Sequence, residues 1–85
     1  MSIGAILEQL TPILRDTFDD DDLVATPQLA ADQVKGWDSL SNVRFFVAVE
    51  QAMSVRFTAA EIGGLKNLGE LADAIIAKQA AGKRR

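Results

Sequence analysis

The stretch Gly36-Trp37-Asp38-Ser39-Leu40 joins a long polar segment to an apolar helical pattern, and it places Ser39 where a helix should begin. The first turn of a helix has backbone N–H groups without an intrahelical partner and carries partial positive charge, which favours a phosphate. This position suits a serine that carries a phosphate ester. It suits equally a serine whose only role is to cap the helix, so the stretch alone leaves both interpretations open.

Length and composition indicate a small globular protein with restricted chemistry. The 85 residues allow one domain and one small core. The chain contains no cysteine and no histidine, which excludes disulfides, zinc–thiolate sites and an imidazole base. No apolar run approaches the roughly 20 residues of a membrane span, and the first residues show no secretory signal. We therefore expect a cytoplasmic protein with no metal site and no membrane segment.

The charge balance separates an acidic body from a basic end. The net charge is −3, so residues 1–82, without the three cations of residues 83–85, carry −6. An acidic body argues against nucleic acid and anionic lipid as partners, because both select basic surfaces, and it suits partners with basic surfaces. We assign residues 1–82 to one domain and Lys83-Arg84-Arg85 to a basic C-terminal tail.

The first half of the chain predicts one helix followed by a long loop. Apolar residues recur at helical spacing over residues 2–17, where Ser2 can serve as the N-cap. Thr11-Pro12 predicts a kink or break in this helix, because proline removes a backbone hydrogen bond. Residues 19–38 have no sustained periodicity and form a loop of unusual length for a small domain. The apolar residues expected to pin this loop to the core are Leu23, Val24, Leu29 and Val34.

The run Asp19-Asp20-Asp21-Asp22 opens this loop and raises the question of a calcium site. Its spacing lacks the central glycine and the distal glutamate of a calcium-binding loop. Runs of like charge normally face solvent, so the sequence favours a solvated acidic turn.

Residues 39–53 predict a second helix with two apolar stripes. The stripe that should enter the core consists of Phe45, Val49 and Met53, widened by Phe46. The other stripe begins beside Ser39 and consists of Leu40, Val43 and Val47, with Arg44 next to it. A helix of this kind is either wholly buried or presents one face to a partner, and the pattern alone favours neither.

The last third of the chain predicts a short helix and a longer one. Thr58 and Glu61 have the spacing of a capping box, and Gly63-Gly64 should end the short helix. Asn67 can cap the final helix, with Glu70 three residues further on. The core stripe of that helix comprises Leu68, Leu71, Ala72, Ile75 and Ile76. No segment alternates with a period of two, so the predicted fold is an all-α four-helix bundle with a long loop between helices 1 and 2.

The sequence does not predict catalysis by the chain itself. A nucleophilic serine needs a base within hydrogen-bond reach, and no histidine is present to serve Ser39. Asp38 is adjacent to Ser39 in sequence, but its side chain would point away from the Ser39 hydroxyl and could not act as its base. We therefore expect a protein that is not an enzyme.

Taken together, the helices, the long loop and the serine between them resemble the acyl carrier protein family over nearly the whole chain. The Asp-Ser-Leu triplet alone is weak evidence for this family, but its position at the start of the second helix, among the other matches, makes the resemblance specific. The residues that carry the resemblance are Gly36-Trp37-Asp38-Ser39-Leu40, Val43, Ala48, Glu50, Phe57, Glu61-Ile62, Leu65, Asn67-Leu68 and Glu70-Leu71.

The resemblance implies that Ser39 is esterified by 4′-phosphopantetheine, which a separate phosphopantetheinyl transferase takes from coenzyme A with magnesium. It also implies that Asp38 helps to bind the metal during this transfer. The arm would carry acyl intermediates as thioesters to acyl-loading and acyl-processing enzymes of fatty-acid, polyketide or related specialised biosynthesis. The cofactor would thus supply the sulfur that the chain lacks. We expect residues 1–82 to form an acyl-carrier-type domain that acts as a monomer.

The second helix departs from the pattern of typical fatty-acid carriers, whose acidic second helix docks on basic patches of enzymes. Arg44 stands here where an acid is usual, which resembles carriers of specialised pathways and some peptidyl carriers. The partner-binding residues would then be Leu40, Val43, Arg44 and Val47. Two alternatives stay open: a peptidyl or aminoacyl carrier, and a non-carrier helical interaction module in which Ser39 is only a helix cap.

Overall fold

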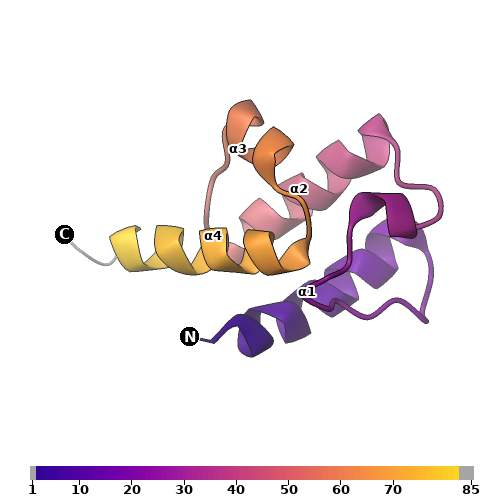
Figure 1. The fold of residues 1–85 in the computed structure, drawn as a ribbon, viewed down its shortest axis with the longest axis horizontal. Coiled ribbons are helices and arrows are strands. Elements are labelled where there is room, and N and C mark those ends of the chain that lie inside the picture. The colour runs from indigo at the N-terminus through magenta and orange to yellow at the C-terminus, as the bar shows by residue number, and fades with distance from the viewer. Residues whose placement is uncertain (1, 83–85) are drawn as a thin grey trace.

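The computed structural model describes residues 2–82, which fold into four α-helices and one short 3₁₀ helix, with no strand in that range. The elements are α1 (Ile3–Phe18), η1 (Ala31–Gln33), α2 (Ser39–Met53), α3 (Ala59–Gly64) and α4 (Leu68–Gly82). α1 packs against both α2 and α4, and the short α3 joins α2 to α4 (Figure 1). The predicted all-α bundle, with three longer helices and a long loop after the first, is confirmed. The predicted basic tail at 83–85 lies outside the described residues.

α1 is a single helix, so of the kink or break predicted at Thr11-Pro12 the break does not occur. Pro12 lies inside the helix and is exposed, as is Glu8, whose carbonyl loses its donor there. Water can take the place of the missing N–H on this face, which removes most of the reason for the helix to end. The N-cap is Ser2, as predicted, and its hydroxyl accepts the Ala5 N–H at 3.2 Å.

The loop of residues 19–38 is fastened to α1 by two polar contacts. The Thr11 hydroxyl donates to the Leu7 carbonyl at 3.1 Å and accepts the Ala25 N–H at 3.0 Å. The Arg15 guanidinium donates to the Leu23 carbonyl at 2.8 Å. These contacts fix the path of the loop across α1.

Three of the four predicted loop anchors are buried or half-buried, and two of them pack against the core cluster. Val34 is buried, and Leu23 and Leu29 are half-buried against the core cluster. Val24 is exposed, so its prediction is wrong, and its neighbour Ala25 is buried instead. The backbone N–H of Ala25 is held by α1, which turns Ala25 inward and Val24 outward.

The acidic run Asp19–Asp22 is exposed throughout. Asp19 ends α1 in the left-handed region, with φ of 50°. The Asp20 side chain accepts the Asp22 N–H at 3.0 Å, which makes a tight local turn. Within residues 2–82 no group of three or more acidic side chains is arranged to hold a metal ion.

α2 buries only one of its two apolar stripes. Phe45, Phe46, Val49 and Met53 are buried, as predicted. Leu40, Val43 and Val47 are exposed, so the alternative of a wholly buried helix is wrong. The remaining core comes chiefly from α1 (Ile6, Leu7, Leu10, Leu14) and α4 (Leu68, Leu71, Ala72, Ile75), with Ile76 half-buried at its edge. No helix in residues 2–82 combines the length and apolarity that crossing a membrane requires.

The caps of α3 and α4 form largely as predicted. Thr58 and Glu61 make the reciprocal capping box, and α3 ends at Gly64. Asn67 accepts the Glu70 N–H at 2.9 Å, while the Glu70 carboxylate accepts the Lys66 N–H at 2.8 Å.

The long loop also provides hydrogen-bond acceptors for the start of α4. The first two N–H groups of the helix, at Leu68 and Gly69, donate to the Leu29 and Pro27 carbonyls at 3.0 and 2.9 Å. The loop that leads to Ser39 is therefore tied to α4 as well as to α1.

Candidate functional site

Ser39 is the first residue of α2, and Asp38 is the N-cap. One carboxylate oxygen of Asp38 accepts the Ser41 N–H at 2.9 Å. Ser39 is exposed, and no hydrogen bond within residues 2–82 engages its hydroxyl. The serine is thus not the residue that caps the helix, and its hydroxyl is open to an incoming group.

The Asp38 carboxylate is an exposed anion beside this hydroxyl. Its pKa is lowered from the ordinary value, chiefly by the hydrogen bond from the Ser41 N–H. A carboxyl with a lowered pKa is a weak base, so it does not activate Ser39 for catalysis. An exposed, ionised carboxylate is the kind of ligand that Mg²⁺ takes from proteins.

The turn before Ser39 is fixed by contacts on both sides of it. Gly36 adopts φ of +87°, in the left-handed region that favours glycine. The Gly36 carbonyl accepts the Ser41 hydroxyl at 3.2 Å. The Trp37 indole N–H donates to the Asn42 side-chain oxygen at 3.0 Å, which ties the end of the loop to the second turn of α2. Ser39 is therefore presented by a constrained backbone.

Trp37 is half-buried between α1 and α2. Its ring centroid lies 4.8 Å from that of Phe18 and 5.2 Å from that of Phe45, and the contact with Phe45 is edge-on. Both distances fall in the range of favourable aromatic pairs. The sequence reasoning did not identify this role of Trp37 or its bond to Asn42. In the sequence, only the position of Trp37 directly before Asp38-Ser39 hints at a role for it near the site.

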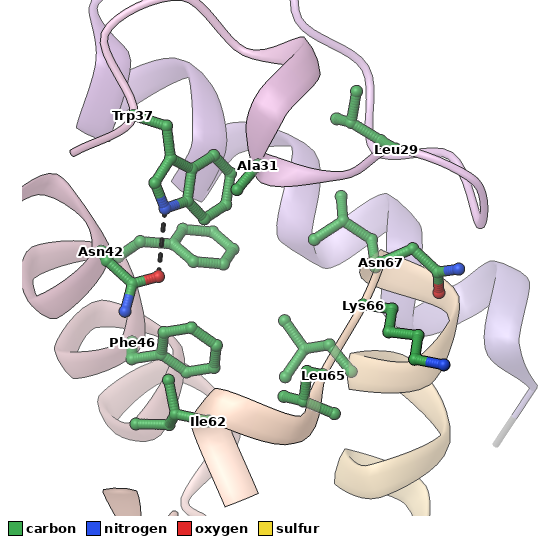
Figure 2. Close-up of a pocket in the computed structure, with 12 residues that line it drawn as sticks. Leu29, Ala31, Trp37, Asn42, Phe46, Ile62, Leu65, Lys66 and Asn67 are labelled. Carbon is green, nitrogen blue, oxygen red and sulfur yellow. Dashed lines mark hydrogen bonds between the residues drawn. The ribbon is translucent and has the colours of Figure 1, made fainter. Parts of the chain in front are cut away.

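A small apolar cavity of about 70 Å³ opens beside this anchor, between the long loop, α2 and the segment from α3 to α4. Figure 2 shows Trp37 and Asn42 on one side of it and Ile62 and Leu65 on another. Lys66 lies at the rim, and its ammonium group points away from the cavity (Figure 2). The cavity was not predicted, because its lining comes from segments far apart in the sequence.

The predicted partner-binding residues lie together on one exposed face of α2. The exposed fractions of Leu40, Val43 and Val47 are 69%, 59% and 45%. Arg44 is exposed as well, and its spacing from Leu40 and Val47 places it on the same face. This face begins one residue after Ser39.

Comparison with solved structures finds a chain of the same fold. A holo acyl carrier protein from Geobacter metallireducens, determined by solution NMR, is 41% identical to this chain, with a TM-score of 0.83. The match covers 89% of this chain and 87% of that one. No protein-family model matches the sequence, and no curated protein matches it.

Proposed function

We propose, given that this chain belongs to the acyl carrier protein family, that Ser39 carries a 4′-phosphopantetheine arm on which acyl groups are held as thioesters. The single observation that supports this most strongly is the exposed Ser39 hydroxyl, which no hydrogen bond within residues 2–82 engages at the first residue of α2. When attached, the arm supplies a thiol to a chain that has no cysteine. The chain would then act as a carrier, and the chemistry would be done by partner enzymes.

Asp38 has two tasks in this proposal. It caps α2, which holds the serine at the helix terminus, and it offers an anionic ligand for the magnesium ion that a phosphopantetheinyl transferase uses. The capping role of Asp38 weighs against the alternative in which Ser39 is only a cap. With Asp38 in that position, a hydroxyl at residue 39 has no structural task of its own.

The apolar cavity favours an acyl cargo over an aminoacyl one. Most of its lining residues are aliphatic or aromatic, among them Leu29, Phe46 and Ile62, and polar groups come from Asn42, Lys66 and Asn67. Placing the ammonium group of an aminoacyl cargo there would be costly, whereas a hydrocarbon chain would gain from leaving water. The volume of about 70 Å³ would accept only a short part of such a chain without further opening.

The partners in this proposal are a phosphopantetheinyl transferase and the enzymes that load and process the acyl group. Each must approach Ser39 closely enough to reach it or the arm. The exposed residues Leu40, Val43, Arg44 and Val47 lie along the same helix, so we assign them to docking.

Intact-mass measurement tests the assignment of Ser39. The chain is incubated with coenzyme A, magnesium and a broad-specificity phosphopantetheinyl transferase, and it should gain the mass of one phosphopantetheine. Ser39→Ala should gain nothing, with an unchanged far-UV circular dichroism spectrum. Ser41→Ala, two residues further along, is the matched control and should gain the full mass. Modification of Ser39→Ala to the same extent as the parent would refute the proposal.

A further inference from the structure

The charge on the exposed side of α2 is opposite in sign to that of the whole chain. The chain has 12 acidic and nine basic residues. Helical spacing gathers Leu40, Val43, Arg44, Val47 and Gln51 on one side of α2, here called the docking face. Its one charged member is a cation, Arg44. An acidic protein thus presents an apolar surface with a positive charge next to its proposed modification site.

The acidic residue nearest to this face, Glu50, is occupied elsewhere. It is half-buried, and its carboxylate accepts the Phe57 N–H at 2.8 Å, which ties the end of α2 to the segment before α3. Arg44 makes no ion pair within residues 2–82, where the one ion pair joins Lys78 to Glu61. The positive charge of Arg44 is therefore available to a partner.

The docking face continues into a shallow groove at the end of α2. The groove is lined by Val47 and Gln51 of the face, by Glu50 beside it, and by Ser54, Val55 and Arg56 beyond it. Arg56 is exposed and makes no ion pair within residues 2–82. The face and groove together run the length of α2, about 22 Å for 15 residues. Two unpaired cations, Arg44 and Arg56, are spaced along this strip, and its one carboxylate, that of Glu50, is already bonded to the Phe57 N–H.

We infer that the docking face and groove bind a partner enzyme whose own surface offers an apolar patch flanked by carboxylates. This inference rests on the proposed carrier function and adds the charge of the partner. Three of the five large apolar side chains exposed in residues 2–82 lie on this face, and covering them is favourable. Arginine pairs with carboxylates through two parallel hydrogen bonds, and charge complementarity selects among partners that are equally apolar.

A charge-swapped pair of enzymes tests this inference. One is a fatty-acid synthase enzyme that acts on carrier-bound acyl groups through a basic docking patch. The other is the same enzyme with the lysines and arginines of that patch replaced by glutamate. Transfer from the acyl-loaded chain is measured with both, as kcat/KM at low and at high salt. Docking alone is measured with the ¹⁵N-labelled Ser39→Ala chain, which cannot carry the arm.

The parent chain should favour the acidic enzyme by about two- to five-fold per matched charge pair, and salt should reduce this preference. Arg44→Glu and Arg56→Glu should each shift the preference toward the basic enzyme. Asp73→Lys makes a charge change of the same size and opposite sign on an exposed residue of α4, outside the face, the groove and the cavity, and it should shift nothing. Val47→Ser should slow transfer to both enzymes without lowering the melting temperature. In the labelled chain, the amide signals of α2 and residues 54–56 should move with the acidic enzyme.

Equal transfer to both enzymes, or an effect of Asp73→Lys as large as that of Arg44→Glu, would overturn the inference. So would amide shifts confined to other elements, or shifts that appear with increasing chain concentration alone, which would indicate a second copy as the occupant. Failure of the proposed function is recognised separately, because the parent chain would then gain no phosphopantetheine mass.

Discussion

Asp38 caps α2, so Ser39 does not have to cap the helix and also serve as the proposed attachment point. The aspartate supplies the cap of α2 by accepting the Ser41 N–H, and the serine hydroxyl is left exposed at the positive end of the helix. The same carboxylate is the anion proposed to hold magnesium during loading. Because capping needs only an oxygen acceptor and metal binding needs the charge, a substitution can separate them.

We expect Asp38→Asn to keep the cap and to lose the metal assistance, since asparagine caps helices about as well as aspartate does. Its melting temperature at neutral pH should stay close to that of the parent. Its rate of loading by the transferase should fall by roughly ten- to a hundred-fold. Asp38→Ala should lower both quantities. Loading of Asp38→Asn at the parent rate, followed by mass spectrometry, would show that Asp38 is structural only.

The Asp38 cap also predicts a pH dependence of stability. The hydrogen bond from the Ser41 N–H lowers the pKa of the Asp38 carboxyl in the folded chain. The stabilisation is therefore fully present above the unfolded pKa of about 3.9 and is lost as the pH falls through the lower folded value. In urea titrations between about pH 5 and pH 2, the parent should lose stability relative to Asp38→Asn. A difference that stays constant over this range would contradict the assigned cause.

Among the elements, helix ends were predictable wherever a cap was local in sequence. α2 spans the predicted residues 39–53, and α3 begins at the predicted capping box. Of the kink or break predicted at Thr11-Pro12, the break did not occur, because Pro12 faces solvent and its lost hydrogen bond costs little. Which apolar residue of the loop turns inward depends on the contact between Thr11 and Ala25, which is 14 residues away in sequence and has no local signal.

Gly69 marks the closest approach between the long loop and α4. A Cβ added there would lie 2.9 Å from the Pro27 carbonyl oxygen, a backbone atom that can move only with the loop. We expect Gly69→Ala to lower the free energy of unfolding by about 1–3 kcal/mol, as overpacking does. Gly64→Ala, at a helical position with open space around it, is the control and should be neutral or slightly stabilising. Equal stability of the two variants in urea would show that the loop does not press on α4.

At the scale of the whole molecule, the site is built from α2, the long loop and the segment from α3 to α4. The sequence does not show how these three parts pack against one another. Ser39 lies at the end of α2 that is far from the start of α1 and the end of α4 (Figure 1). Trp37 joins the loop to α1 and α2, and the cavity beside it adds Ile62 of α3 and Leu65 of the segment between α3 and α4. The sequence predicted the four α-helices and the exposed serine but not η1, whereas the cavity exists only once the elements are packed.

The position of Trp37 makes cargo entry measurable. It is the one tryptophan of the chain, and it lines the cavity, so its emission should change when an acyl chain enters. Loading the arm with acyl groups of increasing length should shift the emission to shorter wavelength, relative to the unacylated arm. Asn42→Ala, which removes the hydrogen bond to the indole, should alter the starting spectrum and keep the shift. Emission that is identical with and without cargo would place the acyl chain outside the cavity.

The central claim, that Ser39 is the point of attachment, is tested most directly by locating the added mass within the loaded chain. Trypsin cuts after Lys35 and Arg44, and it releases one peptide that contains both Ser39 and Ser41. Fragmentation of that peptide should assign the phosphopantetheine to Ser39, with Ser41 unmodified. Added mass on Ser41, or on any peptide other than residues 36–44, would contradict the account.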